Sequence, residues 1–192
     1  MRVEPNNVIN FIAFQVAWFA CVLGGANDRA LAGTMVVGAV IGLHLALAQR
    51  PRQEALLIAV AAVIGLVWDS WLVAFGLMSY PTGNFASGLA PYWIVAMWAL
   101  LATSLNLSMA WLKGRPWLAA LFGAVGGPLA YLAGERLGGL QMSDPVLALG
   151  AQALGWAVLF PMLTQLAARL NGFGPAPPSA WSRVPQEARS NV

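Results

Sequence analysis

Residues 55–78 read ALLIAVAAVIGLVWDSWLVAFGLM, a run in which Asp69 carries the only charge. A helix of this length extends about 36 Å at a rise of about 1.5 Å per residue, more than the roughly 30 Å hydrocarbon core of a bilayer. So long an apolar run with a single charge is typical of a transmembrane helix. The stretch therefore predicts a membrane crossing with one carboxyl group inside it.

Five further apolar runs flank this one and are separated from it, and from each other, by polar breaks or breaks that contain proline or glycine. The six helices that the pattern predicts cover residues 8–23, 30–48, 55–78, 91–112, 117–137 and 145–170. We therefore expect an all-α, polytopic membrane protein: a bundle of six transmembrane helices with short loops, forming a single domain over residues 1–170.

The composition excludes several other classes of protein. Of 192 residues, 59% are hydrophobic and 9% are charged, which is incompatible with an ordinary soluble domain. The net charge of +3 is small and scattered, so no nucleic-acid partner is expected. One cysteine, Cys21, and one histidine provide neither an intrachain disulfide nor a structural zinc site, and we expect no metal and no cofactor.

The basic residues predict the orientation of the bundle. Eight of the ten Lys and Arg residues fall on the side that holds both termini, whereas only Arg29 and Arg136 fall on the other side. Cytoplasmic loops are enriched in Lys and Arg, so both termini are expected in the cytoplasm. Residues 171–192 begin with a stretch rich in Gly and Pro and are predicted to form a disordered cytoplasmic tail.

Asp69 is the first candidate functional residue, because an ionisable group inside the bilayer is costly unless its neighbours shelter it. Small residues on the same face of its helix indicate contact with another helix rather than with lipid. Two readings remain open. In one, a polar cluster lines a small cavity in the outer half of the membrane; in the other, an Asp69–Arg136 pair joins two helices. The residues of the predicted cluster are Asp69, Ser70, Glu135, Arg136 and Gln152.

A second polar layer is predicted nearer the cytoplasmic side. Its members are Gln15, His44, Thr103, Asn106 and Gln165. His44 shares a helix face with Val37, opposite Gly38 and Gly42, and this placement favours an interfacial histidine over a ligand or a proton relay. Gln15, Asn106 and Thr103 are typical of hydrogen bonds between helices, with a functional site as the alternative.

Glycine pairs at a spacing of four also recur. They are Gly38 and Gly42, Gly123 and Gly127, and Gly134 and Gly138. Such pairs let helix backbones approach, and in a six-helix bundle we expect packing within the chain rather than a dimer interface. The uncharged loop over residues 79–90 is read either as a lid over an outer cavity or as a simple turn.

Known catalytic motifs do not fit the sequence. It contains no zinc-protease helix and no phosphate-binding loop in a suitable setting, and the level of the only histidine does not match that of the candidate serine nucleophiles Ser70, Ser79 and Ser87. We therefore do not expect catalytic residues, although an enzyme is not excluded.

Several motifs together resemble one bacterial membrane family, catalogued as domain of unknown function 2878. They include Asn10-Phe11-x-x-Phe14-Gln15-x-x-Trp18-Phe19, Trp68-Asp69-Ser70, Ala90-Pro91-x-Trp93, the region of Asn106, Gly126-Gly127-Pro128 and Gly134-Glu135-Arg136-Leu137-Gly138. The resemblance covers about residues 6–171. It implies a small multi-pass protein of the bacterial inner (plasma) membrane, without an established activity.

Three functions agree with the sequence. The first is a binding or transport-type module for a small amphiphile, a lipid or a metabolite, alone or as a subunit of a membrane complex. The second is a membrane-embedded enzyme or accessory subunit that modifies lipid acyl chains. The third is a structural or assembly protein. Beyond the lipid bilayer itself, an amphiphilic ligand and a protein partner in the membrane are the partners that we expect.

Overall fold

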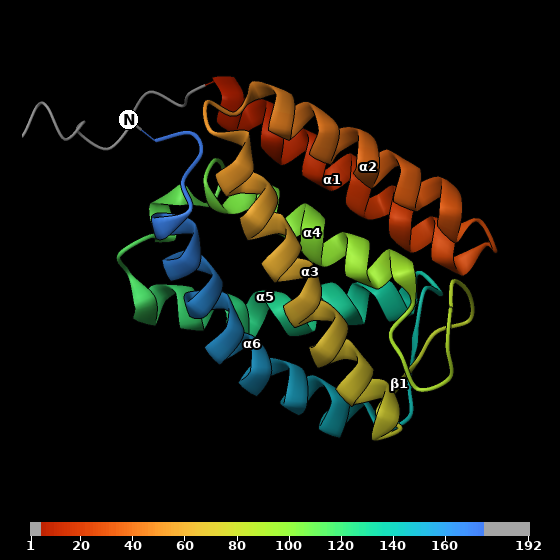
Figure 1. Cartoon of the computed structure of the whole chain (residues 1–192). Coiled ribbons are helices and arrows are strands. Elements are labelled where there is room, and N and C mark those ends of the chain that lie inside the picture. The colour runs from red at the N-terminus through yellow and green to blue at the C-terminus, as the bar shows by residue number, and fades with distance from the viewer. Residues whose placement is uncertain (1–4, 175–192) are drawn as a thin grey trace, which may run out of the picture.

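The computed structural model describes residues 5–174, which form a bundle of six α-helices (Figure 1). The helices are α1 (Pro5–Ala26), α2 (Ala30–Leu47), α3 (Pro51–Ala74), α4 (Tyr92–Leu105), α5 (Pro116–Arg136) and α6 (Pro145–Arg169). A 3₁₀ turn, η1 (Ala110–Leu112), follows α4, and two short strands, β1 (Met78–Ser79) and β2 (Gln141–Met142), pair in antiparallel fashion. The predicted all-α architecture is confirmed.

Five of the helices are long and apolar enough to cross a membrane, whereas α4 is shorter. The sequence predicted an apolar segment over residues 91–112, but the α-helix ends at Leu105, and a turn and η1 complete the passage. Residues Trp98 through Leu105 are all buried, because α4 packs against α1, α2, α3 and α6. A helix enclosed in this way lies at the centre of the bundle and meets little lipid.

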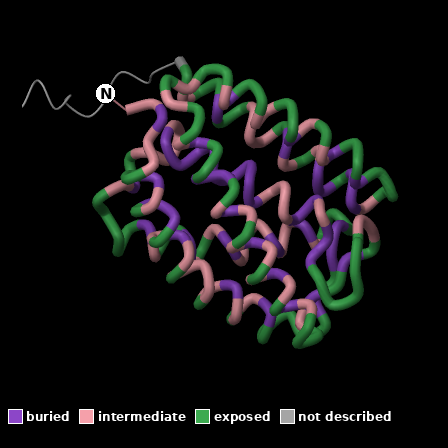
Figure 2. Tube along the Cα trace, in the orientation of Figure 1, coloured by how far each residue is buried: buried purple, intermediate pink, exposed green. Residues whose placement is uncertain are grey.

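The two ends of the bundle are distinct. The "termini end" holds the start of α1, the α2–α3 turn, residues 106–115 and the end of α6 (Figure 1). The "hairpin end" holds the paired strands β1 and β2 and the loop that follows β1. Large apolar side chains are exposed around the outside, with Trp117 88% and Val146 81% exposed, and Figure 2 shows exposed positions along the outer helices. Outward-facing hydrocarbon is what a bilayer requires.

Close helix approach explains one of the predicted glycine pairs. A Cβ atom at Gly123 would lie 2.3 Å from the backbone oxygen of Trp156, and one at Gly127 would lie 2.3 Å from the Trp156 ring. These two glycines therefore seat α5 directly on α6, as expected for packing within the chain. Gly38 and Gly42 behave differently: no atom of residues 5–174 lies within 4 Å of a Cβ atom at either position, so this pair is not used in packing among the described residues.

The loop after β1 is a fixed cap over the hairpin end. Thr82 Oγ1 donates to the carbonyl of Gly25 at 2.6 Å, and Trp93 Nε1 donates to the carbonyl of Thr82 at 3.1 Å. The backbone N–H of Ala90 donates to Ser70 Oγ at 3.0 Å. The loop therefore folds back over this end of the bundle and is bonded to α1, α3 and α4, which is closer to the predicted lid than to a simple turn.

Residues 171–174 belong to the fold rather than to the predicted tail. This segment, called the strap below, lies against the start of α3: Arg50 N donates to the carbonyl of Gly172 at 3.1 Å. Asn171 Oδ1 accepts from the backbone N–H groups of Phe173 and Gly174 at 3.1 and 2.8 Å, which fixes a local turn. The predicted tail boundary at residue 171 is therefore too early, and the tail prediction for residues 175–192 lies outside the described residues.

Candidate functional site

A cavity of about 400 Å³ lies between α1, α4, α5 and α6. Its lining is almost entirely hydrocarbon and ring surface, with Phe14 and Trp18 from α1, Trp98 from α4 and Trp156 from α6. The wall formed by α5 carries little bulk, because four of its lining positions are glycine: Gly123, Gly126, Gly127 and Gly134. The cavity is therefore lined by apolar surface from four of the six helices.

The cavity runs from the surface of the bundle inward. On its rim, Phe122 and Leu129 are 40% and 57% exposed, whereas Trp93 and Trp98 in its floor are almost completely buried. α1 packs against α2 and α4, and α5 packs against α6, so the two helices border the cavity without packing tightly on each other. The opening therefore faces sideways, toward whatever surrounds the helices.

The hairpin end of the cavity is closed. A Cβ atom at Gly139 would lie 3.2 Å from the backbone oxygen of Val22, and one at Gly138 would lie 3.5 Å from Ala26 Cβ. The turn after α5 thus rests on the last turns of α1. The lining on α5 extends from Phe122 to Gly134, about 18 Å along the helix axis at 1.5 Å per residue.

Asp69 lies behind the floor of the cavity in a fully buried hydrogen-bond network. Its Oδ1 accepts from Tyr80 Oη at 3.1 Å and Tyr131 Oη at 2.7 Å, and its Oδ2 accepts from Trp98 Nε1 at 2.6 Å. All three partners are uncharged donors. Burial is the main cause that raises the pKa of Tyr80 well above its ordinary value, and the Asp69 charge adds to it, so this phenol keeps the proton that it donates.

This geometry corrects both readings of Asp69 from the sequence. Arg136 is exposed at the end of α5 and is not among the partners of Asp69, so the predicted ion pair does not form. Asp69 is 0% exposed and does not itself line the apolar cavity; Trp98 and Tyr131 separate the two. The carboxylate therefore orients two side chains of the cavity floor from behind, and the predicted polar cavity around it is replaced by an apolar one beside it.

Three other predicted members of this cluster also have structural partners. Gln152 is buried, accepts from Trp68 Nε1 at 3.1 Å and donates to Met78 Sδ at 3.7 Å. Glu135 Oε1 accepts from the backbone N–H of Met142 at 2.9 Å and so holds β2. Ser70 Oγ accepts the hydrogen bond from the backbone N–H of Ala90 described above. Ser70 and Glu135 thus secure the hairpin end around Asp69. Gln152 also bonds Tyr131, a direct partner of Asp69, and so belongs to the Asp69 network as predicted.

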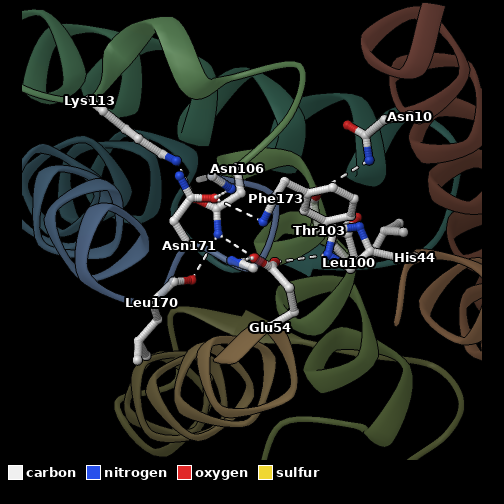
Figure 3. Close-up of polar contacts among 12 residues, drawn as sticks. Asn10, His44, Glu54, Leu100, Thr103, Asn106, Lys113, Leu170, Asn171 and Phe173 are labelled. Carbon is white, nitrogen blue, oxygen red and sulfur yellow. Dashed lines mark hydrogen bonds and ion pairs between the residues drawn. The ribbon is translucent and has the colours of Figure 1, made fainter. Parts of the chain in front are cut away.

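A second polar site lies at the termini end and centres on Glu54, which is 0% exposed (Figure 3). Its Oε2 lies 2.9 Å from His44 Nε2, and its Oε1 accepts from Asn106 Nδ2 at 2.7 Å and from the Gly172 amide at 2.5 Å. Lys113 Nζ donates to Asn106 Oδ1, so the Asn106 amide bridges an ammonium and a carboxylate. Burial lowers the pKa of Lys113, and the negative charge of Glu54 opposes that shift.

The strap covers this site. Arg50 Nη2 donates to the carbonyl of Asn171 and, at 3.1 Å, to that of Gly174, while Asn106 Nδ2 donates to the carbonyl of Leu170 at 2.9 Å. The Phe173 ring lies against His44 with 4.9 Å between ring centroids (Figure 3). The site is therefore closed by main-chain groups of a segment more than a hundred residues away in the sequence.

The predicted inner layer is corrected at four of its five residues. His44 is 4% exposed and paired with Glu54, not interfacial. Gln15 lines the apolar cavity, and Gln165 is exposed on α6, so neither joins this site. Asn106 does serve as a link, through its bonds to Glu54 and to the carbonyl of Leu170. The Thr103 side chain does not: its Oγ1 donates to the carbonyl of Leu100 within α4 at 2.7 Å, and only its main-chain carbonyl accepts from Asn10 Nδ2, at 3.1 Å.

A family model described as "Protein of unknown function (DUF2878)" matches residues 7–162 of the chain. The chain belongs to this family. No curated protein and no solved structure matches it. The DUF2878 match agrees with the resemblance found in the sequence motifs, and it covers the whole cavity lining, Asp69, His44, Glu54 and Asn106. The strap lies beyond the matched residues.

Glu54 is the functional candidate that the sequence did not single out. It follows Arg50, Pro51, Arg52 and Gln53, a polar stretch that resembles a loop preceding a helix at Ala55. In the structure α3 begins at Pro51, where proline is well tolerated because the first helical N–H has no partner in the helix. A proline followed by an acidic residue in the first turn is the signal that places Glu54 on the helix.

Proposed function

We propose that this DUF2878 protein is a binding module of the bacterial inner membrane that holds the acyl chain of a lipid-like amphiphile in the cavity between α1 and α5. The cavity is the observation that carries the proposal. Its volume of about 400 Å³ falls within the range of about 300–1,000 Å³ of small-molecule sites. A lining of rings and glycines offers contact to hydrocarbon and little to a polar solute.

The direction of the opening supports a lipid as the occupant. The rim residues lie on helices that are long and apolar enough to cross a bilayer, so the medium at the mouth of the cavity is acyl chains rather than water. The α5 lining of about 18 Å compares with about 15 Å for half of the hydrocarbon core, so one chain of one leaflet spans it. Entry from the side requires no passage of a polar group through the bundle.

The orientation of the protein is part of the proposal. The excess of Lys and Arg on the termini end supports cytoplasmic termini and, with them, a periplasmic hairpin end. The alternative of an enzyme acting on acyl chains receives no support from the cavity, because its lining contains no pair of a nucleophile and a base. A transport step, or membership of a larger complex, would build on the same binding site.

Filling the cavity tests the proposal. Gly126 lines the cavity, and a Cβ atom there would meet only the Phe122 ring, at an ordinary contact distance of 3.8 Å. Gly126→Leu should therefore occupy the cavity without breaking the fold. After reconstitution with phosphatidylethanolamine and phosphatidylglycerol and gentle extraction, native mass spectrometry should show about tenfold less retained lipid than in the unmodified protein, since overpacking excludes the chain.

Gly150→Leu is the matched control. Gly150 also lies inside a helix, and nothing lies within 4 Å of a Cβ atom there, so the same substitution faces outward. It should retain as much lipid as the unmodified protein. Equal retention by Gly126→Leu, or an equal loss in both variants, would contradict binding in the cavity.

A further inference from the structure

The His44–Glu54 pair at the termini end has a chemistry that the acyl-chain cavity does not use. Three donors converge on the Glu54 carboxylate: His44 Nε2, Asn106 Nδ2 and the Gly172 amide. An ionised carboxylate only accepts hydrogen bonds, so the ring nitrogen that faces it carries the proton. While the ring is neutral, this bond therefore holds it in the Nε2–H tautomer.

That tautomer leaves the other ring nitrogen with a free lone pair. His44 Nδ1 is buried and has no hydrogen-bond partner among the described residues. The side chain of His44 is 3% exposed, so the lone pair is shielded from water. Nearly all buried polar groups in proteins are hydrogen-bonded, and this exception lies directly beside a buried carboxylate.

A proton is the ligand that fits. Protonation of Nδ1 converts the neutral ring into an imidazolium that already contacts a carboxylate at 2.9 Å, so the added charge is compensated at once. Besides Glu54 itself, the charged groups near the pair are Arg50, at the start of α3, and Lys113, after η1. The other neighbours, Asn106 and Phe173, are uncharged.

The strap controls access to this nitrogen. A proton on Nδ1 would create a buried N–H with no acceptor, which is costly until water reaches it. The Phe173 ring packs on the imidazole, and the Gly172 amide is bonded to Glu54, so water reaches the ring only when the strap moves. Gly172 makes this closure possible, since a Cβ atom there would lie 2.6 Å from Glu54 Cγ and 2.8 Å from the backbone oxygen of Arg50.

We propose that His44 and Glu54 form a proton-binding site of the membrane domain, and that residues 171–174 are the lid that opens when His44 Nδ1 takes up a proton. The site lies at the opposite end from the paired strands and functions whether or not the cavity holds lipid. Protonation of this site links the open or closed position of the lid to the pH on that side of the membrane.

The single histidine of the chain gives a direct readout. In the full-length protein with ¹⁵N-labelled histidine, the imidazole nitrogen shifts identify the tautomer and its protonation. We expect the Nε2–H tautomer while the lid is closed, and a doubly protonated ring once Nδ1 has taken up its proton. With the lid in place, the two forms should interconvert slowly and give separate signals.

Gly172→Ala displaces the lid and should speed this interconversion at least about tenfold, so that the two signals merge. Gly150→Ala, at a position with open space, should leave the rate unchanged. Phe173→Ala, which keeps Gly172 and removes the ring over His44, serves as the second variant if Gly172→Ala does not fold. A His44 that stays in one neutral form at every pH at which the protein remains folded would overturn the proton site, and equal rates in the unmodified and strap variants would overturn the lid.

Discussion

Asp69→Leu is expected to lower the free energy of unfolding by at least about 3 kcal/mol. The substitution removes the acceptor of three buried donors, on Tyr80, Trp98 and Tyr131, and each unpaired buried donor costs about 1 to 3 kcal/mol. Because these donors come from the β1 loop, α4 and α5, their loss should loosen the hairpin end and the floor of the cavity together. Denaturant titration in detergent micelles, followed by circular dichroism, measures the change.

Asp69→Asn should give an intermediate loss. An amide oxygen in place of Oδ1 still accepts from both tyrosines, but the amide nitrogen then opposes the Trp98 N–H, donor against donor. Asp28→Asn is the control, since Asp28 is exposed with a φ of 56°, a conformation that asparagine tolerates well. If Asp69→Leu unfolds at the same denaturant concentration as Asp28→Asn, the network does not stabilise the fold.

Gly123→Val is expected to destabilise the protein by about 3 kcal/mol or more. The added Cβ atom would lie 2.3 Å from the Trp156 backbone oxygen and 2.7 Å from Phe160 Cβ, so α5 and α6 must separate. Backbone shifts of this kind cost about 1 to 3 kcal/mol, and here the wall of the cavity moves as well. Thermal unfolding in micelles should show a clearly lower midpoint.

Gly38→Val provides the comparison within the same motif. Gly38 also stands four residues before a glycine, yet nothing lies within 4 Å of its Cβ position. Its substitution should change the midpoint little. Similar losses at both positions would show that the α5–α6 contact is not the reason for the glycine pair at 123 and 127.

The apolar runs predicted the number and type of the helices, because the thickness of the bilayer sets the length of the apolar segment that crosses it. They did not predict where α4 ends. Asn106 turns away from the helix to bond Glu54 and the carbonyl of Leu170, a tertiary interaction with residues 52 and 64 positions away. No local pattern at residues 105–112 carries that information.

The faces of individual helices were harder to predict. In α2, the face of His44 and Val37 is buried and the glycine face is exposed, the reverse of the interpretation from the sequence. Lipid and protein interior are both apolar, so hydrophobicity does not distinguish the two faces of a membrane helix. The sequence therefore indicated that Asp69 is sheltered from lipid. It did not indicate which residues face Asp69, so its three hydrogen-bond partners were not predicted.

The central claim is that an acyl chain lies in the cavity beside Trp98 and Tyr131, and a photoreactive phospholipid tests it most directly. A phosphatidylethanolamine with a diazirine along one acyl chain, incorporated into bilayers with the full-length protein, should label the cavity wall on α1 and α5, within residues 14–22 and 122–134. Gly126→Leu should abolish that labelling and leave the labelling of exposed positions such as Val146 and Leu154 unchanged. Labelling confined to such exposed positions in the unmodified protein would contradict the account.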